Sequence, residues 1–141
     1  MFRSTNVPPM WLLRIFSSLH VLAYRLSGGR LGRTMNGMPV LLLTTTGRMT
    51  GKPRTVPVVY LRDGADYVIT PGVVENPAWL LNLRVNPQAR IQVGVSVMPV
   101  GAHEANGEER RRLWVRAPAY WHDYQKAAKS EFPFILLREN E

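Results

Sequence analysis

Six short apolar segments recur along this chain from residue 40 onward, and they restrict the fold more than any other feature. The segments are residues 40–46, 55–61, 67–70, 89–97, 100–104 and 134–137. Their length and their content of Val, Ile, Leu and Thr are typical of strands. The Asp-Gly signal in residues 62–66 predicts a hairpin turn. Because closure removes the exposed edges of a sheet, six strands with hairpin links predict a small, mostly antiparallel β-barrel.

Alternation and proline refine two of these strands. Residues 89–97 alternate in polarity, which predicts a single strand with one apolar face. Five side chains would form that face: Ala89, Ile91, Val93, Val95 and Val97. Pro99 is expected to interrupt the chain after it, and Pro57 predicts an edge or a bulge in the strand formed by residues 55–61.

Helical periodicity begins near the N-terminus. Residues 10–26 follow Pro8-Pro9 and precede Gly28-Gly29, so both ends carry helix boundary signals. The predicted apolar stripe consists of Trp11, Leu12, Ile15, Phe16, Leu19, Leu22, Ala23 and Leu26. We expect a single domain overall, with residues 1–36 as an amphipathic helix and connector and residues 37–141 as the barrel.

Three shorter helices are predicted at the periphery of the barrel. Asn76 is expected to cap a helix that has Pro77 at its first position and runs through Leu83. Asn106 begins a second helix, because Glu109 three residues later completes a capping-box pattern. That helix ends near residue 116, and a third is predicted for residues 119–129. Helices beside an antiparallel barrel give an α+β fold class.

Positive charge is concentrated in the first half of the chain. The formal net charge is +8, and residues 1–62 contain nine Lys or Arg and no Asp or Glu. This asymmetry favours an anionic partner: nucleic acid, a membrane surface or a polyanionic small molecule. Nucleic acid is not expected, because the sequence lacks a recognisable reading motif. A metal is not expected either, since there is no cysteine and the three histidines, His20, His103 and His122, are scattered.

The N-terminal helix has two interpretations. It covers the barrel or a dimer interface, or it lies on anionic lipid with its arginines at the head groups. The arginines that favour the second interpretation are Arg3, Arg14, Arg25, Arg30 and Arg33. The apolar stretch is too short to span a bilayer, which needs about 20 residues. With no convincing signal peptide, the expected location is the cytoplasm. If the helix binds lipid, the protein is expected at the inner face of the cell membrane as a peripheral protein.

The segment 47–54, GRMTGKPR, joins two predicted strands and is the clearest candidate site. Gly47 and Gly51 permit conformations in which successive backbone N–H groups bind an anion. Arg48 and Arg54 suit phosphate or carboxylate oxygens, and Lys52 adds a point charge. The spacing is not that of a P-loop, and a strand rather than a helix follows. The alternative is a solvated, positively charged turn.

Two long segments closely resemble the deazaflavin-dependent nitroreductase family, actinobacterial split-β-barrel oxidoreductases that use coenzyme F420. They read LLLTTTGRMTGKPRTVPVVYLRDG at 41–64 and NPAWLLNLRVNPQARIQV at 76–93. The resemblance extends to the C-terminus and implies an α+β split barrel of about six strands. It also implies hydride transfer from the reduced deazaflavin to a quinone, an enone, a nitroaromatic or a lipid-borne acceptor. Flavin mononucleotide, which also carries a phosphate, is the alternative coenzyme.

The resemblance also implies which residues hold the coenzyme. The loop at 47–54 would bind its phosphate and oligoglutamate tail, and the following strand, the 70–72 loop and the helix after Asn76 would surround its ring. The implied residues are Arg48, Met49, Thr50, Gly51, Lys52, Arg54, Thr55, Val56, Pro57, Val58, Val59, Thr70, Pro71, Gly72, Ala78, Trp79, Leu80, Leu81, Asn82 and Tyr120. Tyr120, with Tyr124 as its neighbour, is the candidate for the acceptor side and for proton donation.

The sequence departs from the family pattern at three places. Met49 replaces a lysine, and the ring loop is shortened to Thr70-Pro71-Gly72-Val73. The usual Tyr-Pro-x-Tyr run reads Ala117-Pro118-Ala119-Tyr120.

The chain contains no nucleophile–base pair, no paired carboxylates and no metal set, and a coenzyme that carries the hydride needs none of these. The alternative function is a non-catalytic module that binds a flavin, a deazaflavin, haem or a fatty acid. The sequence leaves monomer and homodimer open.

Overall fold

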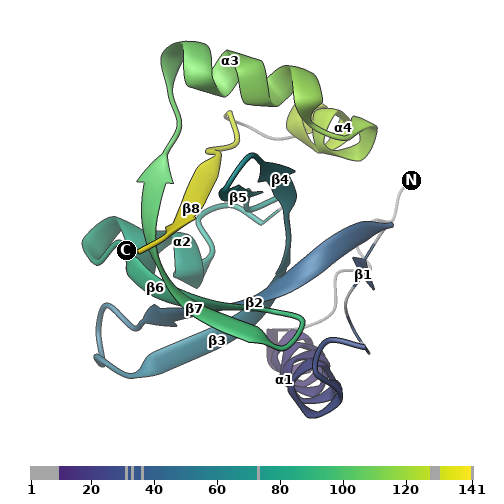
Figure 1. Cartoon of the computed structure of the whole chain (residues 1–141), viewed down its shortest axis with the longest axis vertical. Helices are drawn as coiled ribbons and strands as arrows, with labels where there is room; N and C mark the ends of the chain where they lie inside the picture. Colours follow the sequence, from purple (N-terminus) through teal and green to yellow (C-terminus); the bar gives the residue numbers. More distant parts are fainter. Residues whose placement is uncertain are drawn as a thin grey trace.

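The computed structural model describes residues 10–30, 32, 34–35, 37–72, 74–127 and 131–140, without side chains for residues 10–16 and 127. Strands form a curled sheet at the centre, with α1 at one end and α3 and α4 at the other (Figure 1). The helices are α1 (Met10–Ser27), α2 (Ala78–Val85), α3 (Gly107–Arg116) and α4 (Ala119–Ala127). The strands are β1 (Thr34–Met35), β2 (Met38–Thr46), β3 (Pro53–Val59), β4 (Leu61–Asp63), β5 (Asp66–Ile69), β6 (Gln88–Val93), β7 (Ser96–Glu104) and β8 (Ile135–Glu139).

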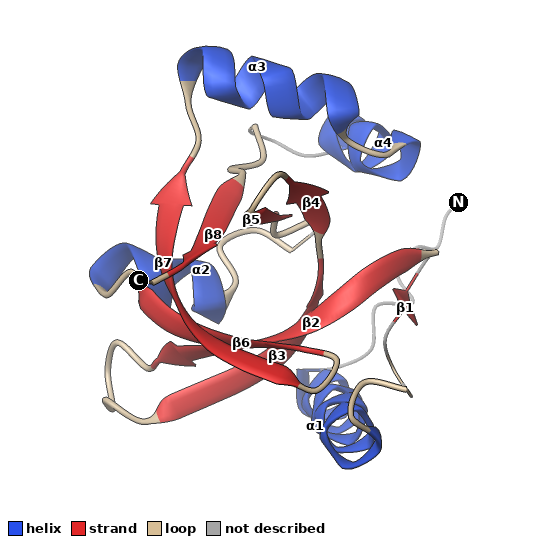
Figure 2. Ribbon diagram, in the orientation of Figure 1, coloured by secondary structure: helices blue, strands red, loops and turns tan. Residues whose placement is uncertain are grey.

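The sheet closes on itself through one continuous piece of chain. The strand order is β1-β2-β6-β7-β8-β5-β4, and β3 pairs with β2. Only Tyr60 separates β3 from β4. Because β3 pairs with β2 and β4 pairs with β5, this short connection links strands from opposite ends of the strand order and closes the barrel. Every pairing is antiparallel. The predicted α+β class and antiparallel barrel are therefore confirmed, as Figure 2 shows.

The prediction of a single strand over residues 89–97 is wrong. The chain reverses after Val93 through Gly94, which has φ +62°, and β6 and β7 pair as a hairpin. Val95 is 81% exposed at this turn and does not continue the buried face. Pro99 does not interrupt β7 either. It lies opposite Arg90 in the β6–β7 ladder, and its carbonyl accepts the N–H of Asn140 at the end of β8.

One predicted N-cap residue and one predicted capping box are also wrong. Pro77 rather than Asn76 is the N-cap of α2, and the Pro77 carbonyl accepts the N–H groups of Leu80 and Leu81. Asn76 instead adopts a left-handed conformation with φ +48° in the preceding turn. Asn106 occupies the N-cap position of α3, but its side chain makes no capping hydrogen bond. The carboxylate of Glu109 bonds His103, so the capping box does not form.

Several strands are buried on both faces because helices cover the outside of the barrel. In β2, Leu41 and Leu43 pack into the barrel interior, whereas Val40 and Leu42 pack against α1. In β8, Leu137 faces the interior and Leu136 faces the α3–α4 layer. This explains why these segments are nearly continuous apolar runs instead of alternating ones.

The rotation of α1 differs from the predicted stripe. Among the side chains described in α1, Val21 and Tyr24 are buried, whereas the predicted stripe members Leu19, Leu22 and Leu26 are 56%, 52% and 79% exposed and Ala23 is half-buried. The other stripe residues, Trp11, Leu12, Ile15 and Phe16, and the arginines Arg3, Arg14 and Arg33 lie outside the described side chains. The helix covers the barrel, as one of the two interpretations expects, but it leaves a row of leucines in solvent.

Two contacts at the end of α1 explain this rotation. The N–H of Gly94 donates to the Tyr24 hydroxyl at 2.8 Å, which fixes the helix against the β6–β7 turn. Gly29 follows with φ +86°, and a Cβ there would lie 2.6 Å from the Gly94 Cα. Only glycine permits this close approach.

Candidate functional site

A cavity of about 520 Å³ lies beside β3, where residues of α1 and of α4 both reach this strand. Its walls are largely apolar. They come from α1 (Ser17, His20), β1 (Met35), β3 (Val56–Val59), the segment after β5 (Thr70–Gly72 and Val74), the start of α2 (Pro77, Trp79) and α4 (Tyr120, Trp121, Tyr124). These are six separate places in the sequence, so the cavity exists only because the barrel brings them together.

The cavity unites about half of the predicted site. Its lining includes the predicted ring-side residues of β3, the 70–72 loop, Trp79, Tyr120 and Tyr124. The other predicted residues do not line it: Arg48, Met49, Thr50, Gly51, Lys52, Arg54, Thr55, Ala78, Leu80, Leu81 and Asn82. Among these, Leu80 is 1% exposed in the barrel core, and Ala78 is exposed. The predicted residues are thus divided between an apolar cavity on one hand and the charged loop and α2 on the other.

Two hydroxyl groups at the cavity lack partners. Thr70 Oγ1 and Tyr120 Oη are the buried side-chain polar atoms without a hydrogen bond in the described part of the chain, and both residues line this cavity. Burying a hydroxyl without a partner costs roughly 1–3 kcal/mol. Their occurrence in one cavity therefore points to a ligand that carries hydrogen-bonding groups.

The Tyr120 phenol remains protonated at neutral pH. Burial raises its pKa above the ordinary value, and the nearby Tyr124 acts in the same direction. The Trp121 side chain opposes this shift but does not complete a hydrogen bond of normal geometry. Tyr120 can therefore donate its proton to a ligand oxygen.

Four backbone N–H groups of the 47–52 loop already have acceptors. The N–H groups of Gly47 and Gly51 donate to the carbonyls of Lys52 and Gly47 at 2.8 and 2.7 Å. The Arg48 N–H donates to Asn82 Oδ1, and the Lys52 N–H donates to Thr50 Oγ1. These four N–H groups are thus occupied, and the predicted anion site of free backbone N–H groups does not form from them.

Asn82 supports the loop from α2. Its side chain is 2% exposed, donates to Thr45 Oγ1 at 3.0 Å, and accepts from both the backbone and the guanidinium of Arg48. Thr45 lies opposite Arg54 in the β2–β3 ladder. One buried amide therefore fixes the part of the loop that carries its cations.

Sequence reasoning missed several site residues. Arg25 of α1 donates to Thr55 Oγ1 at 3.0 Å, which places a further cation beside β3. The cavity also includes Ser17, His20, Met35, Val74, Pro77 and Trp121. A signal for His20 existed: it interrupts an apolar helical stretch, three residues after Ser17 on the same face.

The loop and the cavity are within reach of one extended molecule. Both lie along β3, whose residues Val56–Val59 line the cavity and whose start carries Arg54. At about 3.3 Å per strand residue, Arg54 and Val58 are separated by roughly 13 Å. A ligand with an apolar ring in the cavity and an anionic tail along β3 would fit both features.

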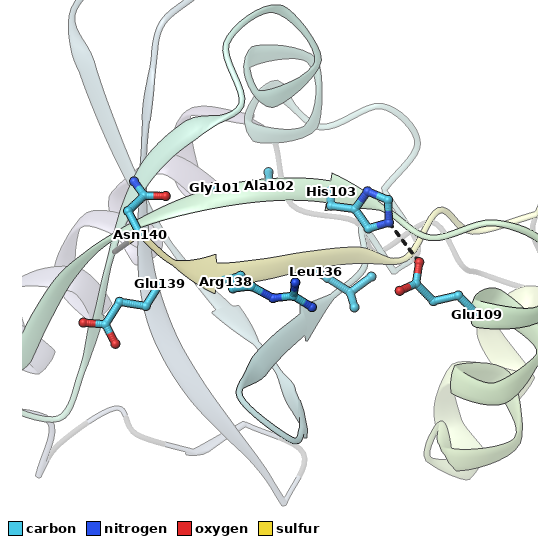
Figure 3. A pocket seen from close by; sticks show the side chains of 8 residues that line it. All are labelled: Gly101, Ala102, His103, Glu109, Leu136, Arg138, Glu139 and Asn140. Carbon is cyan, nitrogen blue, oxygen red and sulfur yellow. Dashed lines mark hydrogen bonds and ion pairs between the residues drawn. The ribbon is translucent and has the colours of Figure 1, made fainter.

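A second hollow of about 540 Å³ lies on the outer side of β7 and β8 next to α3. Figure 3 shows it with His103 joined to Glu109 and with Arg138 along its floor. Arg138 is already bonded to Asp66 at 2.7 and 2.8 Å. None of the predicted site residues lines this hollow.

The described residues contain no group of three or more His, Cys, Asp or Glu side chains placed to hold a metal ion. No helix among them has both the length and the apolar content required to cross a bilayer.

The closed antiparallel sheet and the cavity beside β3 define the class: a split β-barrel of the kind found in flavin- and deazaflavin-dependent oxidoreductases. A solved structure described as an F420-H2 dependent reductase (FDR-A) has a TM-score of 0.63 and 32% identity, covering 71% of this chain and 94% of that one. Another, described as a domain-swapped dimer, has a TM-score of 0.65 and 28% identity, covering 93% and 100%.

The sequence comparisons are more specific. The F420H(2)-dependent quinone reductase Rv1261c of Mycobacterium tuberculosis is 40% identical over 133 residues, covering 84% of this chain and 87% of that protein. The model of the F420H(2)-dependent quinone reductase family matches residues 16–138. The chain therefore belongs to the F420H(2)-dependent quinone reductase family. The resemblance to deazaflavin-dependent reductases and the assignment as an oxidoreductase are confirmed.

Proposed function

We propose that this protein transfers a hydride from reduced coenzyme F420 to a quinone. The family match and the 40% identical relative, whose name states this reaction, support it. The observation that carries it is the apolar cavity with two unpartnered hydroxyls, reached along β3 from a cationic loop. Of the acceptor classes expected from the sequence, the quinone is the one that the family's description names.

The residues divide into a tail-binding and a ring-binding group. Arg48, Lys52 and Arg54 are exposed cations that suit the phosphate and carboxylates of the coenzyme tail. β3 pairs with β2 along one edge, and Val56–Val59 line the cavity where a ring would lie. The first N–H groups of α2 have no acceptor within the helix, and Pro77 and Trp79 place that positive end at the cavity.

When bound, the reduced coenzyme supplies the hydride and, as it is oxidised, releases one proton. The balanced reaction is F420H2 plus quinone to F420 plus hydroquinone. The chain's part is to position both molecules and to provide a hydrogen-bond donor that orients a quinone oxygen. The Tyr120 hydroxyl, protonated and unpartnered, suits this role.

The direct test adds reduced coenzyme and a soluble naphthoquinone, menadione, to the purified protein. We expect oxidised coenzyme to appear faster than without protein and faster than with an enone or a nitroaromatic acceptor. Absence of turnover with every acceptor would contradict the catalytic proposal. Binding without turnover would favour the non-catalytic module instead.

The charged loop has its own test. The double change Arg48→Glu with Arg54→Glu should weaken coenzyme binding by about 100-fold or more, because charge-assisted hydrogen bonds contribute roughly 1.5–3 kcal/mol each. The measurement is titration calorimetry of the wild type and the variant. Arg111→Glu with Lys126→Glu is the control, because it changes the net charge equally at exposed cations on α3 and α4. Unchanged affinity in the first variant would refute the loop's role.

We extend the proposal to the location of the reaction: α1 lies on an anionic membrane surface and gives the cavity access to lipid-soluble quinones. Leu19, Leu22 and Leu26 form an exposed apolar row on α1, with Arg25 and Arg30 exposed near its C-terminal end. Such a helix suits the boundary between head groups and acyl chains.

The competing occupant of this leucine row is a second copy of the chain. One of the solved relatives is described as a domain-swapped dimer. A dimer would have twice the 16.0 kDa mass and would be seen by light scattering without lipid.

A further inference from the structure

The first helix contributes a polar side chain to the cavity that the predicted site does not include. His20 and Ser17 both line the cavity from α1. The helix is held against the barrel by buried Val21 and Tyr24, which follow on the same side. His20 is therefore positioned by the fold of the whole barrel rather than by a mobile surface helix.

The ring of His20 is fixed by one hydrogen bond and one close approach. Its Nε2 lies 2.7 Å from the carbonyl oxygen of Gly32. A carbonyl can only accept, so Nε2 carries the hydrogen. Gly32 has φ +77°, and a Cβ there would lie 2.6 Å from Cδ2 and 2.7 Å from Nε2 of the ring. Any other residue at position 32 would displace the imidazole.

This arrangement leaves Nδ1 available. No hydrogen bond to Nδ1 is formed by any residue in the described ranges. The other polar groups in the lining are the hydroxyls of Ser17, Thr70, Tyr120 and Tyr124 and the indole N–H groups of Trp79 and Trp121. Among groups lining the cavity, only the imidazole can accept a hydrogen bond at a ring nitrogen when neutral and donate from it when protonated. It is therefore suited to move a proton in both directions.

We propose that His20 Nδ1 hydrogen-bonds an oxygen of the quinone and delivers to it the proton that completes its reduction. This inference rests on the proposed function. The two electrons enter the quinone with the hydride as the C–H bond of the reduced carrier breaks. The proton passes to the quinone oxygen from Nδ1–H of the imidazolium, whose Nε2–H stays bonded to the Gly32 carbonyl, and it forms the hydroquinone O–H. The imidazole then regains a proton from solvent, where the oxidation of the carrier releases one, so the reaction is balanced.

The first test uses the protein without coenzyme, so that it does not depend on turnover. Long-range ¹H–¹⁵N spectra of the imidazoles should show His20 with its hydrogen on Nε2. Menadione should shift the His20 signals and leave those of His103, which lies in the other hollow, unchanged. Quenching of tryptophan fluorescence, with Trp79 and Trp121 in the wall, reports binding independently. Quinone binding without a change at His20 would overturn the inference.

The second test is kinetic. His20→Gln keeps a donor for the Gly32 carbonyl but cannot carry a proton, so we expect kcat to fall about 100-fold with little change in KM for menadione. His20→Ala should fall similarly and recover partly when imidazole is added to the solution. His103→Gln is the matched control and should behave as the wild type. A merely structural role would not give rescue by imidazole, and an unchanged kcat in His20→Gln would refute the proton transfer.

Failure of this inference differs from failure of the proposed function. If the wild type turns over and His20→Gln is equally active, the proton-transfer role of His20 is refuted and the proposed function stands. No wild-type turnover, with menadione still shifting the His20 signals, removes the reaction and the proton transfer and leaves His20 as a quinone ligand.

Discussion

Thr70 and Tyr120 show how a functional site differs from the rest of a protein interior at the scale of single residues. Buried polar atoms are normally hydrogen-bonded, because an unmet hydroxyl loses its interactions with water without replacement. Here the two that lack partners among the described residues share one cavity. Burying these two hydroxyls without partners destabilises the fold, which is the physical reason to expect that a ligand supplies the missing hydrogen bonds.

The prediction at this scale concerns Tyr120→Phe. Because the hydroxyl makes no bond within the protein, its removal should leave the free energy of unfolding within about 0.5 kcal/mol of wild type, or raise it. Turnover of menadione should fall at least tenfold, since a hydrogen-bond donor to the quinone oxygen is lost. Thermal denaturation and steady-state kinetics measure the two effects. A large loss of stability would mean that the hydroxyl has an internal partner.

Tyr120 also gives a pH dependence with a definite sign. Burial raises its pKa above that of the unfolded chain, where tyrosine ionises near 10. Its contribution to stability is therefore constant below about pH 10 and is lost as pH rises through the folded-state value. The difference in the free energy of unfolding between Tyr120→Phe and wild type should accordingly stay constant up to about pH 10 and then grow in favour of the variant.

At the scale of elements, α2 connects the two halves of the site. Its first turn reaches the cavity through Pro77 and Trp79. One turn later, Asn82 bonds Thr45 of β2 and Arg48 of the loop. A short helix thus sets the position of the cationic loop relative to the ring-binding cavity.

The prediction at this scale concerns Asn82→Ala. The change removes an amide that satisfies three hydrogen bonds and leaves buried Thr45 without that partner, so unfolding should become easier by roughly 1–3 kcal/mol. The released loop should also bind F420 more weakly, while menadione quenching at the cavity stays near the wild-type value. Asn86→Ala is a matched control, because Asn86 follows the same helix and its side chain accepts only the nearby Gln88 N–H. Equal coenzyme affinity in Asn82→Ala and wild type would exclude a positioning role for Asn82.

At the scale of the whole molecule, charge and apolar surface are both asymmetric. The acid-free half of the chain contains the cationic loop and α1, and α1 carries the exposed leucine row. The acidic residues lie in the second half, where Asp63 at the end of β4 bonds Arg112 and Arg116 of α3. The anionic coenzyme and the anionic membrane would therefore both interact with segments from the first half of the chain.

The prediction at this scale replaces the leucine row with serine: Leu19→Ser, Leu22→Ser and Leu26→Ser together. Binding to vesicles containing anionic lipid should fall at least tenfold in a sedimentation assay, because about 0.8 kcal/mol per buried CH₂ is lost. Stability should change little, since each side chain is more than half exposed. Val115→Ser on α3, 80% exposed, is the control. Undiminished vesicle binding, or loss of a lipid-independent dimer instead, would argue against the membrane role.

The sequence by itself determined the local features. Apolar runs and the Asp-Gly turn located the strands, paired glycines located the end of α1, and the family resemblance located much of the cavity lining. These predictions succeed because backbone preference and side-chain periodicity act over a few neighbouring residues.

Only the tertiary structure decided the rest. The rotation of α1 depends on Gly29 and Tyr24 meeting Gly94, about 70 residues away in the chain. The loss of free N–H groups in the 47–52 loop depends partly on Asn82 from α2. The place of His20 at the cavity depends on closure of the whole barrel. No local pattern encodes such contacts, because the same helix or loop sequence is compatible with several orientations until the packing of distant segments selects one.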